Sequence, residues 1–194
     1  NTRSFEITSV PLGENTVIRT LYKDREGIIW IGTSTGLIRY SESGFREYNT
    51  QNSKLSHNTV RAVLQDQSGN LWVGTYDKLN KLPKGGHTFI PFDLKGDYKP
   101  SLKNNLICDV KPAYSDSLIW VGTETGLVLL NIMTGARKTF TEKVAGFSNE
   151  VIKNIYTDDH GNLWLGTDFG LNIFNPHTRT NKSVFHNPQL PYSI

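Results

Sequence analysis

The chain has 194 residues, 37% of them hydrophobic and 11% aromatic, a length and composition that suit a substantial buried core and exclude a disordered chain. Its 21 basic residues nearly balance 18 acidic ones, and both are scattered instead of forming the basic stripe that tracks a phosphate backbone. We therefore expect no direct contact with nucleic acid, and no apolar run of about 18 residues predicts a transmembrane helix.

The sequence repeats one unit four times. The four tryptophans of the chain lie in nearly the same string, GIIWIGTSTGL, GNLWVGTYDKL, SLIWVGTETGL and GNLWLGTDFGL, at spacings of 42, 48 and 44 residues. A period of this size, with four short apolar segments in each unit, is typical of a β-propeller blade. The sequence therefore predicts an all-β fold of four four-stranded antiparallel blades, built around Trp30, Trp72, Trp120 and Trp164.

The predicted elements follow the same order in each unit. An apolar pair such as Ile18 and Leu21 marks the first strand, a polar turn follows, and the tryptophan marks the second strand. A third strand follows a Gly-Leu step, and a fourth ends in aromatic residues such as Tyr48. The predicted parts are a preceding blade tail or closing strand at 1–14, repeats at 15–50, 56–93, 103–140 and 148–185, and the start of a fifth repeat at 186–194.

An acidic residue and a glycine recur in the first turn of three units, DREG, DQSG and DDHG. The acid can accept backbone N–H bonds and the glycine supplies the positive φ of a tight hairpin. Turn capping is favoured over catalysis for these acids, because the repeat spaces them too far apart for a carboxylate pair. The third unit has PAYSDS with one residue more between its strands, which predicts a longer or bulged hairpin. The turn acids are Asp24, Asp66 and Asp158.

The motif tryptophans are expected to fill the wedge between adjacent sheets, because indole rings are wide, flat and favoured in strands. The glycines two residues later, Gly32, Gly74, Gly122 and Gly166, are expected to leave room for close approach of the neighbouring blade. In the second unit Lys78 stands where the other units have glycine, so either its backbone is strained or the loop has re-formed.

The sequence predicts no catalytic residues, no metal site and no cofactor. The five histidines and Cys108 lack the spacing of metal ligands, and neither a nucleophile elbow nor a phosphate-cradling loop is present. Cys108 lies in the apolar run LICDV, which predicts a packed side chain and not a reactive thiol.

The candidate ligand contacts are the positions at which the repeats differ. The loop after Gly-Thr carries polar and aromatic side chains that could bond to a sugar and stack on it. An unused, variable surface loop is the alternative interpretation. The candidate residues are Tyr76, Asp77, Glu124 and Asp168.

The pattern V-x-x-I-x-x-D-x-x-G-x-x-W-x-G-T-x-x-G-L resembles the two-component regulator propeller repeat. The first and fourth units carry it in full, whereas the second lacks the last glycine and the third lacks the turn. The resemblance implies two propellers of about seven blades in a sensor region on the periplasmic face of a membrane-anchored hybrid histidine kinase. It further implies detection of glycan-derived oligosaccharides, relay of the signal to the kinase, and regulation of transcription.

We therefore expect a sensor segment without catalysis of its own, forming an open arc of a larger propeller. A closed four-bladed ring is the alternative architecture. The expected partners are an oligosaccharide, further blades of the same chain and a second copy in a homodimer. The alternative functions are a propeller enzyme, either a lyase or a glycan hydrolase, and a protein-interaction scaffold.

Overall fold

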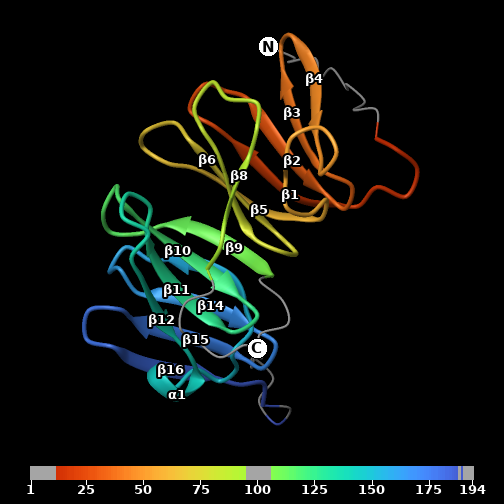
Figure 1. Cartoon of the computed structure of the whole chain (residues 1–194). Coiled ribbons are helices and arrows are strands. Elements are labelled where there is room, and N and C mark those ends of the chain that lie inside the picture. The colour runs from red at the N-terminus through yellow and green to blue at the C-terminus, as the bar shows by residue number, and fades with distance from the viewer. Residues whose placement is uncertain (1–11, 95–105, 188, 190–194) are drawn as a thin grey trace, which may run out of the picture.

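The computed structural model describes residues 12–94, 106–187 and 189. These residues form four antiparallel sheets of four strands, and in each sheet the strands are paired in chain order. We call the sheets blades 1 to 4. Figure 1 shows the blades following one another in an arc, with blade 1 and blade 4 at its two ends. The predicted all-β fold of four propeller blades is confirmed.

In each blade the first strand lies on the inner side of the arc and the fourth on the outer side. The first strands of successive blades contact one another. A single helical turn, α1 (Glu142–Ala145), follows the last strand of blade 3. Blade 1 contains β1 (Ile18–Lys23), β2 (Ile29–Thr33), β3 (Leu37–Ser41) and β4 (Gly44–Tyr48). Blade 2 contains β5 (Val60–Gln65), β6 (Leu71–Thr75), β7 (Leu79–Leu82) and β8 (Ile90–Phe92). Blade 3 contains β9 (Ile107–Pro112), β10 (Leu118–Thr123), β11 (Gly126–Asn131) and β12 (Arg137–Phe140). Blade 4 contains β13 (Ile152–Thr157), β14 (Leu163–Thr167), β15 (Leu171–Asn175) and β16 (Thr180–Val184).

The hydrophobic core is divided into three clusters, one between each pair of successive blades. In the first, Trp30 of blade 1 packs with Val60 and Val63 of blade 2. The tryptophan of one blade thus meets the apolar pair of the next blade, and this arrangement is repeated twice. The second cluster contains Trp72, Ile107 and Val110, and the third contains Trp120, Ile152 and Ile155.

Glycines permit this close packing. A Cβ atom on Gly74 would lie 2.6 Å from Cγ2 of Ile107 in the next blade. On Gly122 it would lie 2.8 Å from the backbone oxygen of Ile152. Gly166 differs, because the nearest atom to its added Cβ belongs to its own blade and is 3.7 Å away. Glycine is therefore sterically required where another blade follows.

Each end of the arc leaves one packing surface uncovered. Trp164 in blade 4 is 37% exposed, whereas its three counterparts are at most 5% exposed. In blade 1 the pair Ile18 and Leu21 is 49% and 66% exposed, although the equivalent pairs in the other blades are buried. Trp164 thus departs from the expected inter-sheet position, because no blade follows it among the described residues. The exposed ends agree with the predicted open arc.

Every inner strand contains a β-bulge at the same place. In β1 the pairing with β2 shifts between Ile18 and Thr20, so the residue between them has no partner. The same shift occurs in β5, β9 and β13. A bulge bends the strand and redirects the extra side chain. The four bulged residues are Arg19, Arg61, Cys108 and Lys153.

The two irregular units differ from the others locally. In blade 3 the first hairpin closes with a 3.1 Å bond from the Ala113 N–H to the Leu118 carbonyl. In blade 1 the equivalent 2.9 Å bond joins Asp24 and Ile28, so the blade 3 loop is one residue longer, as predicted. Lys78 has no positive φ, so its backbone avoids the strained left-handed conformation, while its carbonyl still accepts the Thr75 N–H at 3.1 Å as in the equivalent loops.

The packing difference between the tryptophans generates a stability prediction. We expect Trp72→Ala to lower the free energy of unfolding by about 3–5 kcal/mol, because a buried indole is lost and a cavity remains. We expect Trp164→Ala to cost less than about 1.5 kcal/mol, because that ring is already partly in water. Denaturant unfolding of both variants measures the difference, and equal losses would contradict the inter-blade role.

The glycines allow a second comparison with a built-in control. We expect Gly74→Ala to destabilise the protein by about 1–3 kcal/mol, because the new methyl group overlaps Ile107 of the next blade. We expect Gly166→Ala to change stability by less than about 0.5 kcal/mol, because its added Cβ meets only ordinary van der Waals contacts. Thermal unfolding of the pair tests this steric account, which a neutral Gly74→Ala would refute.

Candidate functional site

A threonine closes the loop between the second and third strands of every blade. In blade 2 the Thr75 hydroxyl donates a 2.9 Å hydrogen bond to the Lys78 carbonyl. The equivalent hydroxyls of Thr33, Thr123 and Thr167 donate to the matching carbonyls at 2.9, 2.9 and 2.8 Å. The Thr of the repeated Gly-Thr pair therefore fixes the loop. We call the loops at 34–35, 76–77, 124–125 and 168–169 the rim loops.

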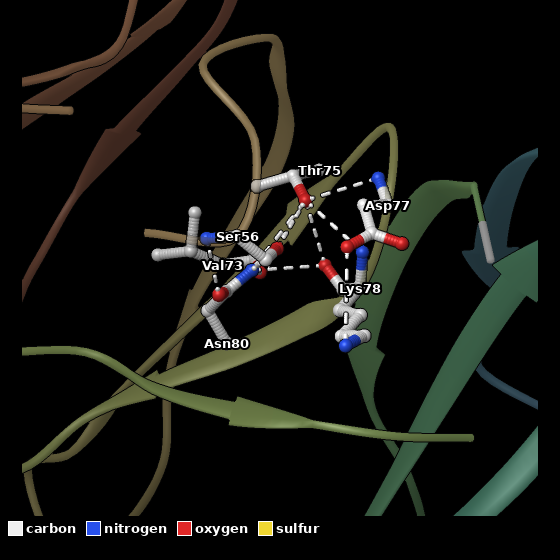
Figure 2. A network of polar contacts seen from close by, with 6 residues as sticks. All are labelled: Ser56, Val73, Thr75, Asp77, Lys78 and Asn80. Atoms are coloured by element: carbon white, nitrogen blue, oxygen red, sulfur yellow. Dashed lines mark hydrogen bonds and ion pairs between the residues drawn. The ribbon is translucent and has the colours of Figure 1, made fainter. Parts of the chain in front are cut away.

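A buried asparagine supports the rim loop in two of the blades. Figure 2 shows that Asn80 lies at the centre of a polar network under the blade 2 loop. Its Nδ2 donates to the Ser56 hydroxyl and to the Lys78 carbonyl, both at 2.9 Å, and its Oδ1 accepts the Ser56 N–H at 3.0 Å. Asn172 and Ser148 form the same pair in blade 4. Because both asparagines are fully buried, satisfied polar networks hold these loops.

Sequence reasoning did not identify this network. The available signal was the asparagine that follows leucine in the third strands LNKL and LNIF, at a position occupied by Ile38 and Val128 in the other two blades. A polar residue inside an apolar strand indicates a buried hydrogen-bonding partner.

Tyr76, a predicted ligand residue, lies where blades 1 and 2 meet. Its ring stacks on His57 with centroids 5.7 Å apart. The guanidinium carbons of Arg19 and Arg61 lie 5.6 and 5.9 Å from its centroid. The Tyr76 N–H also donates to the Thr59 carbonyl at 3.2 Å, which ties the rim loop to the start of the inner strand.

The other predicted ligand residues occupy separate places. Asp168 is exposed and forms a 3.1 Å ion pair with Lys153. Asp77 lies 4.0 Å from the ammonium group of its neighbour Lys78. Glu124 is partly buried. Within the described ranges no hydrogen bond or ion pair joins these four predicted side chains to one another, so they are distributed along the rim.

Cys108 is buried, in agreement with its apolar sequence context. Burial raises the pKa of its thiol to about 11, although Arg61 and Lys153 act in the opposite direction. The thiol is therefore protonated at neutral pH and is a poor nucleophile.

The turn acids bind the indole rings of their own blades. The Nε1–H groups of Trp30, Trp72 and Trp164 donate to Asp24, Asp66 and Asp158 at 2.8, 2.9 and 3.0 Å. The other carboxylate oxygen accepts backbone N–H groups of the turn. The turn capping was foreseen from the sequence, whereas the indole partner was not. Blade 3 lacks the acid, and there Tyr114 packs edge-on against Trp120.

A cavity of about 450 Å³ lies between blades 1 and 2, beside their first turns and away from the rim loops. Its polar lining is largely engaged within the protein, since Arg46 contacts His87 at 3.0 Å and Gln65 donates to Glu26 at 2.7 Å. None of the predicted ligand residues lines it.

Among the described residues, no group of three or more His, Cys, Asp or Glu side chains could hold a metal ion. The residues that the structure describes also contain no helix long and apolar enough to cross a membrane.

Three segments of the chain match the sequence profile described as two component regulator propeller, at residues 11–35, 54–77 and 146–169. Among solved structures, the chain is similar to the extracellular domain of a putative one component system from B. thetaiotaomicron, with a TM-score of 0.81 and 24% identity. That match covers 98% of this chain and 25% of the other. A putative hybrid two component system from the same organism gives a TM-score of 0.75 at 19% identity, covering 87% of this chain and 24% of that one.

Propeller enzymes share the architecture at lower identity. Virginiamycin B lyase from Staphylococcus aureus has a TM-score of 0.70 and 14% identity, with 96% of this chain and 61% of the lyase covered. No curated protein matches the chain. At these identities the structural matches establish the fold. The chain spans about a quarter of the length of the two extracellular domains.

The Asp–Trp bond generates a prediction on protonation. Hydrogen bonds from Trp164 and from Asn162 lower the pKa of Asp158 to about 2. Because the folded-state pKa lies below the usual value, this bond stabilises the fold above about pH 4, and its contribution disappears as pH falls through about 2. Replacing Trp164 by Phe removes the donor and should raise the pKa of Asp158. Carboxyl NMR titration measures the shift, and an unchanged midpoint would show that the indole has no effect.

Proposed function

Because the chain carries repeats of the two-component regulator propeller family, we propose that it is the sensor segment of a hybrid two-component signalling protein. In this proposal it takes part in the detection of glycan-derived oligosaccharides on the periplasmic face of the membrane. The signal then passes to a cytoplasmic histidine kinase that controls transcription. The segment itself carries out no catalysis.

The observation that carries the proposal is the contrast between a repeated frame and varied rim loops. The motif tryptophans of blades 1 to 3 pack against the next blade in the same way, and the threonine makes the same bond in all four blades, so the loops are held at equivalent places. The side chains on those loops are different in each blade, from Ser34 to Tyr76, Glu124 and Asp168. A rigid frame that presents unlike polar and aromatic groups along one edge is suited to recognition of an extended polar ligand.

The similar extracellular domains support the proposed location and the proposed larger assembly. In them a region of this fold is about a quarter of the chain, which leaves room for further blades beside blades 1 and 4. A second copy in a homodimer is also part of the proposal. Ligand binding would then act by shifting one rigid propeller relative to its neighbour. A propeller lyase is the alternative, because the virginiamycin lyase shares the fold.

We predict that the combined variant Tyr76→Ala, Glu124→Ala and Asp168→Ala weakens oligosaccharide binding at least tenfold, because the rim loses its stacking and hydrogen-bonding groups. A calorimetric screen against glycan fragments, followed by titration of the best ligand, measures the loss. The control is Glu42→Ala, which removes an exposed carboxylate from the hairpin between β3 and β4. If the triple variant binds as tightly as the control, the rim is not the binding surface.

A further inference from the structure

The four bulges bring their side chains to one cavity. This cavity, of about 280 Å³, is lined by residues from β1, β5, β9 and β13 and by Val17 just before β1. All four bulged residues take part in the lining. The same cavity contains four basic side chains and a single carboxylate, that of Asp109. Arg19, Arg61, Lys111 and Lys153 are the basic residues.

The carboxylate and the lysines are already neutralised within the protein. Oδ1 of Asp109 accepts a 3.0 Å hydrogen bond from the Lys111 ammonium group, and Oδ2 accepts the Ile155 N–H at 2.9 Å. Lys153 is paired with Asp168 of its own rim loop at 3.1 Å. On the side of blades 3 and 4, therefore, each positive charge has an acidic partner.

The two arginines on the side of blades 1 and 2 are in a different state. Across the described part of the chain, the side chains of Arg19 and Arg61 make no hydrogen bond and no ion pair. Both instead lie over the ring of Tyr76, at 5.6 and 5.9 Å from its centroid. A cation–π contact attracts a guanidinium group but does not cancel its charge. Two like charges thus share one aromatic ring and remain without a counter-charge.

Such a pair favours a bound anion. A guanidinium group offers a planar fork of N–H donors that matches the two oxygens of a carboxylate, a sulfate or a phosphate. Arg61 is partly buried, which strengthens the attraction at its guanidinium group, whereas Arg19 is exposed. The bulges fix this arrangement, because they set the direction of both arginines from the backbone.

We propose that Arg19 and Arg61, with Tyr76 between blades 1 and 2, bind the carboxylate or sulfate group of an acidic oligosaccharide. The inference rests on the proposed sensing of oligosaccharides and adds the chemical class of the ligand. The recognised group is the anion, and the rest of the sugar extends along the rim loops.

The test compares two disaccharides of equal size, digalacturonate and neutral galactobiose, by NMR titration of the protein at low salt. We expect digalacturonate to bind and galactobiose to bind at least tenfold more weakly. Arg61→Gln should weaken digalacturonate binding at least tenfold, and the double variant with Arg19→Gln should abolish it. Raising the NaCl concentration should also weaken the binding.

The matched control is Lys182→Gln, which removes one positive charge from the exposed outer strand β16 and should leave binding within twofold. Circular dichroism verifies that the arginine variants remain folded. Inorganic sulfate at the same ionic strength distinguishes a sugar-borne anion from a free one. The inference is supported if digalacturonate binds tighter than sulfate and depends on Arg61.

Two results would overturn the inference in different ways. Equal binding of both disaccharides, unchanged by the arginine variants, would refute the anion site and leave oligosaccharide sensing intact. Sulfate binding that depends on Arg61, with neither disaccharide bound, would refute the acidic sugar as ligand and would count against sensing by this segment. Absence of binding by all three probes would overturn the anion site itself.

Discussion

The contact between the tryptophan of one blade and the apolar pair of the next is the interaction on which the whole structure depends. A single four-stranded sheet cannot bury both of its faces, so each blade is stable only against a neighbour. The indole is buried between the two sheets, and the glycine two residues later leaves room for a side chain of the next blade. The same tryptophan is bound through its N–H to the first turn in three blades, so the turn and the core are coupled.

The fold could be predicted from the sequence because one unit is repeated. All four copies show the tryptophan and Gly-Thr, and three of them show the preceding Asp-x-x-Gly turn, so an irregular copy is interpreted from the others. Local departures from the repeat could also be predicted, such as the longer first hairpin of blade 3. The exposure of Trp164 was not foreseen, because the burial of a repeated residue depends on whether a neighbour follows, and the residue itself does not encode that.

The site was less accessible to sequence reasoning. The varied positions after Gly-Thr were identified, and the structure places them on loops held by threonine and asparagine networks. Their basic neighbours were missed, because the bulged residues differ in type and stand in strands that were interpreted as core. Arg19 and Arg61 lie 42 residues apart, and only the pairing of two blades brings them to the same ring. Such a pair has no local motif.

The uncovered surfaces at the two ends of the arc are unlike each other, and this has a consequence for assembly. Blade 4 ends in an indole and blade 1 begins with an aliphatic pair, so each end is complementary to the other and not to itself. A contact between these two ends is heterologous, since the tail of one unit meets the head of the next. Such a contact cannot lie on a two-fold axis. Any blade added at either end continues the same head-to-tail series, and the rotation between successive blades decides whether that series closes into a ring.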